Sequence, residues 1–256
     1  SDAVVVLSRD MYELLVDGGV PARIIRIVPN WIDTTAVRPI KESNRFRHEH
    51  ELEDKFVIMY SGNMGMSQNL AQVLEAAELL RGREDISFAM VGDGADRRNL
   101  ERIASEKRLT NVRFYDYQPK AELATSLSAA DVHLVILQPH ICQLLMPSKL
   151  YGALASGTPV LAITSMASEL AETVREHDLG QVVSDGRAQN LADAITAMTE
   201  RPQQLAAQGA RARQYAVESC TRRSSVQGMR TLLQMLLGRE STQTMSRLAE
   251  AATASQ

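Results

Sequence analysis

The residue types best suited to chemistry lie together in the stretch 146–160. Pro147 suits the first turn of a helix, and Ser148 is a residue type that caps free N–H groups there. Lys149 adds a positive charge where the helix macrodipole is already positive, whereas helices normally place acidic side chains at that end. A bound anion would neutralise both charges, so the pattern predicts a diphosphate site at this first turn, with Leu150 as its third residue. An ordinary capped helix with a solvated lysine is the alternative that the tripeptide leaves open.

The elements that must position these residues alternate between strand and helix. Gly157 is placed to end the helix with a positive φ, and a buried apolar strand follows it. The same alternation predicts strands at 56–61, 86–91, 111–115, 132–137, 160–163 and 181–183, and helices at 69–81, 95–108, 120–128, 149–155, 168–176 and 189–199. Such alternation with short loops indicates an α/β fold with a doubly wound parallel sheet. Ligands of these sheets bind at the carboxyl ends of the strands, near the point where strand order reverses.

Glycine-rich loops follow the first two of these strands. The first loop runs from Gly62 through Asn63 to Gly65, and it lets the backbone approach a ligand and leaves N–H groups to hold phosphate. The second loop carries Gly92 and Gly94. Tight strand-to-helix turns that need glycine are the alternative for both loops, because an isolated pair of glycines is weak evidence for nucleotide binding.

Six motifs in a consistent order give the chain a resemblance to a known family. They are the Pro-Ser-Lys run with the Leu-Ala-Ser-Gly-Thr-Pro-Val run after it, the two glycine loops, and the segments 28–33, 111–114 and 130–134. Together they resemble the nucleotide-sugar-binding half of the GT-B glycosyltransferases. The similarity is to the large retaining family with many bacterial capsule, O-antigen and exopolysaccharide enzymes, and it covers roughly residues 1–200.

The resemblance implies an enzyme that moves a hexosyl or N-acetylhexosaminyl group from a UDP- or GDP-linked sugar to an acceptor hydroxyl, with retention. Ser148 and Lys149 would be the catalytic residues, because they would stabilise the leaving diphosphate. The donor would also contact Gly62, Asn63, Gly65, Gly92, Gly94, Tyr117, His140, Pro147, Leu150 and Glu169. The scheme needs no cofactor and no metal, and the sequence has no Asp-x-Asp cluster to hold a metal.

Several of these residues also have structural explanations. Tyr117 suits contact with the base, or it is a surface aromatic beside a loop. His140 lies in the loop before the Pro-Ser-Lys run and is a candidate contact for the donor sugar, with an ordinary loop histidine as the favoured alternative. Glu169 matches an acidic position near the donor in the relatives, or it is a first-turn carboxylate on a helix. We interpret His133, inside an apolar strand, as a core histidine, and Trp31 as a packing residue at the domain hinge.

The chain departs from the family at positions that bind the donor. The relatives usually carry two glutamates eight positions apart, the second of which holds the ribose hydroxyls, and here these positions are Leu144 and Gly152. The usual Arg and Lys of the first loop are replaced by Asn63 and Gln68, which leaves Lys149 as the main cation for the diphosphate. The alternative functions are therefore a nonenzymatic nucleotide-sugar-binding module or pseudoenzyme, and a GT-B-type sugar-nucleotide epimerase.

The expected domain organisation has five parts. Residues 1–36 resemble the end of the family's N-terminal acceptor domain, most of which we expect to be missing, so that a glycan or lipid-linked acceptor would bind the absent domain. The other parts are a linker at 37–55, the nucleotide-sugar-binding domain at 56–200, crossover helices at 201–237 and a disordered tail at 238–256. We expect this fragment alone to be inactive.

Composition excludes several other classes of protein. The 256 residues are 45% hydrophobic with a formal charge of −3, which supports a full core and argues against a nucleic-acid binder. Cys142 and Cys220 lack metal-ligand spacing and fit a reducing cytoplasm, and no apolar run reaches about 18 residues. We therefore expect a cytoplasmic protein. Six arginines within residues 201–230 leave peripheral contact with an anionic membrane face open, beside the favoured alternative of a solvated helix face.

Overall fold

The computed structural model describes residues 1–253, with side chains for residues 1–238. Within them, one parallel sheet is formed by β3 (Phe56–Ser61), β4 (Ile86–Val91), β5 (Val112–Tyr115), β6 (Val132–Ile136), β7 (Val160–Ile163) and β8 (Gly180–Val183). Their order in the sheet is β5-β4-β3-β6-β7-β8. The chain therefore runs outward from β3 to one edge, returns to β6 and runs outward to the other edge. This confirms the predicted doubly wound α/β fold and puts the reversal of strand order between β3 and β6.

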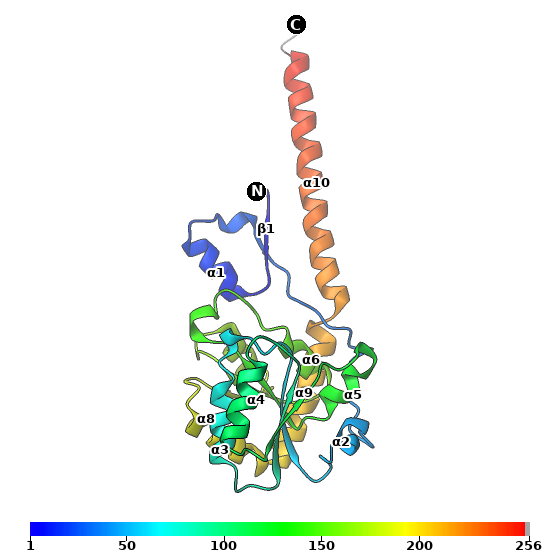
Figure 1. The fold of residues 1–256 in the computed structure, drawn as a ribbon. Coiled ribbons are helices and arrows are strands. Elements are labelled where there is room, and N and C mark those ends of the chain that lie inside the picture. The colour runs from blue at the N-terminus through cyan, green and yellow to red at the C-terminus, as the bar shows by residue number, and fades with distance from the viewer. Residues whose placement is uncertain (254–256) are drawn as a thin grey trace.

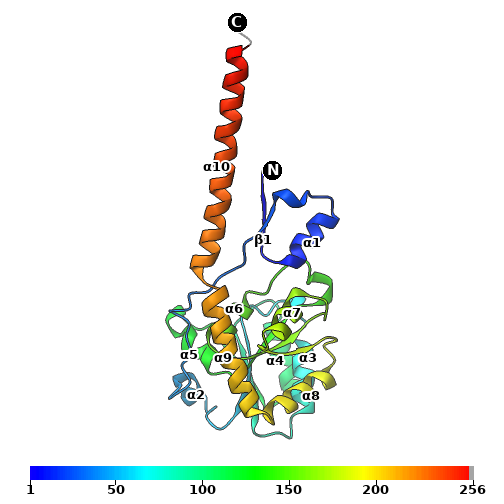
Figure 2. The ribbon, with the colours of Figure 1, turned by 180° about the vertical axis from the view of Figure 1, so that it is seen from behind.

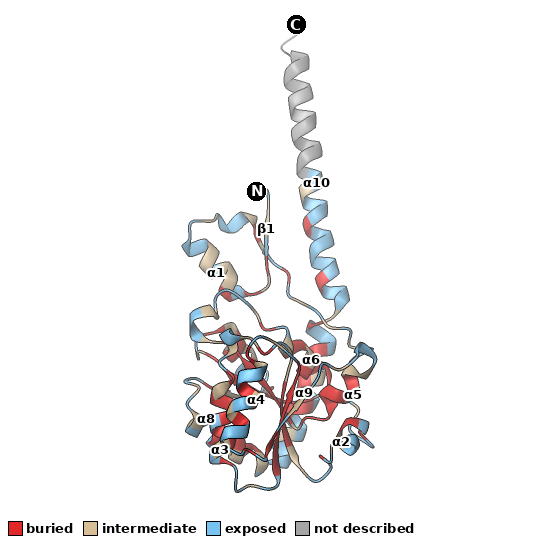
Figure 3. Cartoon of the chain, viewed as in Figure 1, coloured by how far each residue is buried: buried red, intermediate tan, exposed pale blue. Residues whose placement is uncertain are grey.

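Helices cover both faces of this sheet (Figures 1 and 2). One face packs against α3 (Ala71–Leu79), α4 (Arg97–Glu106) and α8 (Ala188–Thr199). The other face packs against α5 (Leu123–Ser128), α6 (Lys149–Ala155), α7 (Glu169–Glu176) and α9 (Pro202–Ser219). Successive residues of β6 show the division, since Leu134 joins the first core and Val135 joins the second. Burial on both faces explains why the strands are continuous apolar runs (Figure 3).

Most predicted boundaries agree with the structure, and the exceptions have local causes. The strands β3, β4 and β7 and the helix α6 have the predicted limits. The helix predicted at 69–81 begins only at Ala71, because Asn69 has a left-handed backbone with a φ of 48°. The helix predicted at 95–108 ends at Glu106, and Arg108 is likewise left-handed, with a φ of 53°. The short helix α2 (Arg45–Glu49) lies in the predicted linker and packs against the sheet.

A small second sheet lies apart from the large one (Figure 1). Its strands β1 (Val4–Val6) and β2 (Ile25–Ile27) pair in parallel, and α1 (Arg9–Asp17) connects them. The helix α10 (Arg222–Thr253) extends past this sheet on one side. The division of the chain into five parts stays a prediction. Apart from Gly238, the tail predicted at 238–256 lies outside the residues whose side chains are described.

We expect β1 and β2 to be the least protected strands in hydrogen exchange. A two-stranded sheet is marginally stable alone, and Val5 and Ile27 are exposed. The amides of Val4 to Val6 should therefore exchange much faster than those of β3, a central strand of the large sheet. Equally slow exchange in β1 and β3 would contradict the assignment of residues 1–36 to a separate domain.

Candidate functional site

A cavity of about 540 Å³ lies at the carboxyl edge of the large sheet, beside the reversal of strand order. Its walls come from the end of β3 and its loop, the loop after β5, the helices α5 and α6, and the segment 30–32. The cavity brings together five of the residues that the sequence predicted, namely Gly62, Asn63, Tyr117, Ser148 and Lys149. Its position is the one at which doubly wound sheets bind their ligands.

Lys149 is a partly buried cation in this cavity. Its side chain crosses the β3 loop at Gly62, where an added Cβ would lie 2.6 Å from Lys149 Cε. Its Nζ lies 5.2 Å from the ring centroid of Tyr60, and burial lowers the pKa of the amine. No carboxylate pairs with Lys149 among the residues whose side chains are described. A desolvated cation without a protein anion contributes little to stability, and it is well placed to bind an anionic ligand.

Ser148 stands at the start of α6 but does not cap it. Its backbone is helical, with φ −61° and ψ −21°, and its hydroxyl makes no capping hydrogen bond. The alternative of an ordinary serine cap is therefore wrong, and Ser148 lines the cavity beside Lys149. Pro147 and Leu150 do not line it, because Pro147 is buried and Leu150 packs into the core. Contact of these two residues with a donor stays a prediction.

The loop after β3 uses most of its N–H groups internally. Gly62 donates to the carbonyl of Val91 at the end of β4 over 2.9 Å, and Met64 donates to the carbonyl of Asp93 in the loop after β4 over 2.8 Å. Gly65 donates to the Gln68 side chain over 2.8 Å. The expectation that this loop leaves N–H groups for phosphate is wrong for those three residues. Asn63 lines the cavity. Among residues 62–65 it is the one whose N–H has no such acceptor.

Gly92 and Gly94 lie against the first loop rather than in the cavity wall. Gly92 has a φ of 132°, and a Cβ there would overlap the carbonyl oxygen of Gly62. A Cβ at Gly94 would lie 2.5 Å from the carbonyl oxygen of Met64. Close packing of the two loops therefore accounts for both glycines, and their contact with a donor stays a prediction.

Tyr117 and His133 line the cavity at different depths. Tyr117 is 55% exposed, and its hydroxyl donates to the carbonyl of Asp93 over 3.4 Å. His133 is buried, and its Nε2 lies 2.9 Å from the carbonyl oxygen of Leu127. Burial lowers the pKa of His133 to about 4, so the ring is neutral near pH 7. This confirms the prediction of a core histidine.

Glu169 and His140 do not line the cavity. Glu169, in the first turn of α7, accepts a hydrogen bond from the N–H of Arg9, and its own N–H donates to the Asp10 carboxylate over 2.9 Å. Burial raises the pKa of Glu169, and the neighbouring Glu172 pairs with the Arg9 side chain. These bonds join α7 to α1. His140 is exposed in the loop after β6. Contact of either residue with a donor sugar stays a prediction.

The sequence did not predict every residue that lines the cavity. The additional wall residues include Asn30, Trp31, Ile32, Gln118, Leu123 and Leu127. The first three belong to the segment 28–33, which was recognised as a motif, and Trp31 was assigned to the hinge between domains. A large aromatic side chain within such a motif is the signal that sequence reasoning passed over.

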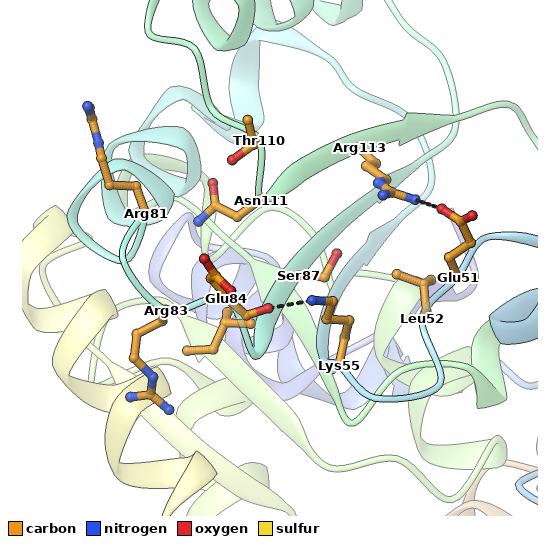
Figure 4. Close-up of a pocket in the computed structure, with 11 residues that line it drawn as sticks. Glu51, Leu52, Lys55, Arg81, Arg83, Glu84, Ser87, Thr110, Asn111 and Arg113 are labelled. Atoms are coloured by element: carbon orange, nitrogen blue, oxygen red, sulfur yellow. Dashed lines mark hydrogen bonds and ion pairs between the residues drawn. The ribbon is translucent and has the colours of Figure 1, made fainter.

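A smaller cavity of about 250 Å³ lies at the opposite, amino-terminal edge of the sheet (Figure 4). Its basic side chains have partners within the protein. Lys55 Nζ donates to the carbonyl of Glu84 over 2.6 Å, and an Arg113 nitrogen lies 3.8 Å from a carboxylate oxygen of Glu51. This cavity is therefore a weaker candidate for an anion site than the one that contains Lys149.

Some of the arginines that left membrane contact open are engaged within the protein. Arg213 donates to the carbonyls of Thr34, Val37 and Ala155, over 2.8 to 2.9 Å. Arg211 pairs with the carboxylate of Asp178 over 2.6 Å. No helix in the described residues is both long and apolar enough to span a membrane. Among the side chains that are described, no group of three or more His, Cys, Asp or Glu is arranged to hold a metal ion.

A doubly wound sheet with a cavity at the reversal of strand order places the chain among the α/β proteins whose ligand sites lie at this edge. Residues 41–215 match the family described as glycosyl transferases group 1. The chain belongs to this family. This confirms the resemblance that the motifs indicated.

Two bacterial relatives show how much of such a protein the chain represents. It is 33% identical over 174 residues to the putative colanic acid biosynthesis glycosyl transferase WcaI of Escherichia coli (strain K12). This match covers 67% of this chain and 42% of the relative. It is 31% identical over 181 residues to the probable glycosyltransferase WbjE of Pseudomonas aeruginosa, and this match covers 70% of this chain and 45% of the relative. The chain therefore matches less than half the length of either relative.

Solved structures match the fold over most of the chain. HepE of Anabaena in complex with UDP-glucose has a TM-score of 0.78 at 17% identity, covering 93% of this chain and 64% of HepE. The sucrose-phosphate synthase of Thermosynechococcus elongatus has a TM-score of 0.78 at 22% identity, covering 93% and 59%. At these identities the likeness shows the fold alone, which is the Rossmann-like half of a GT-B protein.

Proposed function

We propose that this chain binds a UDP- or GDP-linked sugar and forms the donor-binding part of a hexosyl- or N-acetylhexosaminyltransferase. The observation that carries the proposal is Lys149, a desolvated cation without a protein anion, which shares the cavity with Ser148. The complex of HepE with UDP-glucose supports a nucleotide sugar as the ligand. The name of WcaI, a putative colanic acid biosynthesis glycosyl transferase, supports cell-surface polysaccharide synthesis as the proposed process, and the proposal includes a cytoplasmic location for this protein.

In the proposed reaction, the bond between the sugar carbon C1 and the diphosphate oxygen breaks, and C1 forms a bond to the acceptor hydroxyl oxygen. Negative charge grows on the leaving diphosphate, which takes up the proton that the hydroxyl loses. Lys149 supplies a positive charge to that group, and the Ser148 hydroxyl donates a hydrogen bond to it. Partial burial of Lys149 strengthens its interaction with the diphosphate relative to water. The family resemblance implies retention of configuration and independence of metal, and both belong to the proposal. A glycan or lipid-linked acceptor would be bound by a further domain.

Gly152 is the position at which we expect donor affinity to be limited. It lines the cavity, where the relatives' carboxylate would hold the ribose hydroxyls, so we expect parent binding in the high micromolar range or weaker. Gly152→Glu should tighten UDP binding by about 3- to 10-fold, because charge-assisted hydrogen bonds to the ribose exceed the cost of moving one methyl group. That methyl is Leu127 Cδ1, which would lie 3.2 Å from the new Cβ.

Gly152→Ala is the matched control for the glutamate variant. It adds the Cβ and removes the helix-interior glycine, which is worth about 1 kcal/mol of stability, but it supplies no carboxylate. In calorimetric titration with UDP, Gly152→Glu should therefore bind more tightly than the parent, and Gly152→Ala should not. If both variants are folded by circular dichroism and bind UDP no more tightly than the parent, α6 does not face a ribose, and the proposed pose of the donor is wrong.

Nonenzymatic binding of a nucleotide sugar is the second candidate, and the absence of a glutamate at Gly152 favours it. Sugar-nucleotide binding by the full-length protein, without release of nucleoside diphosphate, would support this candidate over transfer. The epimerase alternative requires acid and base carboxylates near the sugar. No Asp or Glu of the described chain lines the cavity, which argues against that alternative.

A further inference from the structure

Trp31 is a large aromatic side chain that lines the cavity and stays 45% exposed. Tyr117, which is 55% exposed, lines the same cavity. Burying an aromatic ring against a partner is favourable, so two half-exposed rings in one cavity indicate a ligand with a flat, apolar face. We propose that Trp31 stacks on the base of the bound nucleotide. The proposal rests on the function proposed above and adds the wall that holds the base.

The backbone beside Trp31 is fixed by the two residues between α9 and α10. The N–H of Ile32 donates to the carbonyl of Cys220 over 2.9 Å, and Ile32 forms a bridge with Thr221. The guanidinium carbon of Arg222 lies 5.6 Å from the centroid of the Trp31 ring, which is a cation–π distance. The ring is therefore positioned before a ligand arrives, which reduces the entropic cost of binding.

The wall to which Trp31 belongs suits a base better than the other parts of a nucleotide sugar. The residues that line the cavity with Trp31 include the uncharged side chains of Ile32, Leu123 and Leu127. A diphosphate needs positive charge, which Lys149 supplies, and a sugar needs hydrogen-bonding partners for its hydroxyl groups. A base instead presents two π faces, and these stack on aromatic rings whichever hydrogen-bonding groups the base carries at its edge. Trp31 should therefore contribute to the binding of both UDP and GDP.

The missing ribose carboxylate makes this wall more important for affinity. With glycine at position 152, no acidic side chain lines the cavity among the described residues, so the ribose lacks the partner that the relatives supply. Binding then depends on contacts to the two ends of the nucleotide. Lys149 and Ser148 serve the phosphate end, and Trp31 with Tyr117 serves the base.

Trp31 reports on its own environment, because it is the single tryptophan of the chain. Titration of the 256-residue chain with UDP or GDP should change its fluorescence in a saturable way. Pyrophosphate has no base, so it should bind at Lys149 without that change. An unchanged signal at UDP concentrations that calorimetry shows to be saturating would overturn the proposal and leave the proposed function standing. If the parent chain binds neither UDP nor GDP, both are overturned.

Two substitutions separate stacking from a packing role. Trp31→Leu should weaken UDP binding about 10-fold, as loss of a base–aromatic stack does, and should leave pyrophosphate binding unchanged. Trp31→Phe keeps an aromatic face and should bind UDP within about 3-fold of the parent. Circular dichroism and thermal melting check that both variants are folded. Equal losses for UDP and pyrophosphate, or equal losses in both variants, would assign Trp31 a packing role and contradict stacking.

Discussion

Lys149→Ala is expected to weaken binding of UDP or GDP by about 10- to 100-fold. Each charge-assisted hydrogen bond contributes roughly 1.5–3 kcal/mol, and 1.4 kcal/mol corresponds to a factor of ten in affinity. No other lysine or arginine of the described chain lines this cavity, so no second cation there compensates for the loss. Calorimetry measures the effect. The salt concentration is held constant, because it sets how strongly charges are screened and therefore changes the affinity for an anionic ligand. The fold should be unaffected, since Lys149 has no carboxylate partner to leave unpaired.

Lys55→Ala is the matched control for this substitution. Lys55 lines the smaller cavity at the opposite edge of the sheet (Figure 4), so its loss changes the net charge equally without touching the proposed site. UDP affinity should be the same as in the parent. Equal affinity of the Lys149→Ala variant and the parent would remove Lys149 from the site. Equal weakening in both variants would show that only the overall charge of the chain matters.

Gly92→Ala is expected to destabilise the fold by about 2–5 kcal/mol, a large part of the typical 5–15 kcal/mol for a domain. Gly92 has a φ of 132°, and the new Cβ would overlap the backbone of Gly62 in the neighbouring loop. Neither a rotamer change nor a small shift relieves an overlap between two backbones. Urea denaturation of the folded chain measures the loss of free energy of unfolding.

Gly82→Ala is the control for the effect of adding a methyl group. A Cβ at Gly82 meets no heavy atom within 4 Å, and its backbone has no positive φ, so the change should be within about 0.5 kcal/mol. A stability of Gly92→Ala equal to that of Gly82→Ala would mean that the two loops do not pack as described. The glycine at 92 would then need an explanation in ligand contact instead.

The sequence was sufficient to predict the sheet because its signal is local. Each strand is a short apolar run between loops, and burial on both faces requires this in a doubly wound sheet. The limits of β3, β4 and β7 were therefore correct. Helix ends were less accurate where Asn69 and Arg108 adopt left-handed backbones, a choice that short-range patterns do not specify.

The site was predicted only in part because much of it depends on contacts between distant segments. Three of the N–H groups expected to be free after β3 are bonded to the end of β4, to the loop after it and to Gln68, and no periodicity in the sequence reveals such pairing. Trp31 was placed at the hinge because its segment precedes the linker, yet it lines the cavity. Glu169 matched a family position, and the structure bonds it to α1.

A crystal structure of the chain with UDP at millimolar concentration tests the central claim most directly. The account predicts the diphosphate beside Lys149 Nζ and the Ser148 hydroxyl, within the cavity of about 540 Å³, and the base at the wall formed by Trp31 and Tyr117. UDP bound in the cavity at the amino-terminal edge, or density absent from the Lys149 cavity in a crystal whose chain binds UDP in solution, would contradict it.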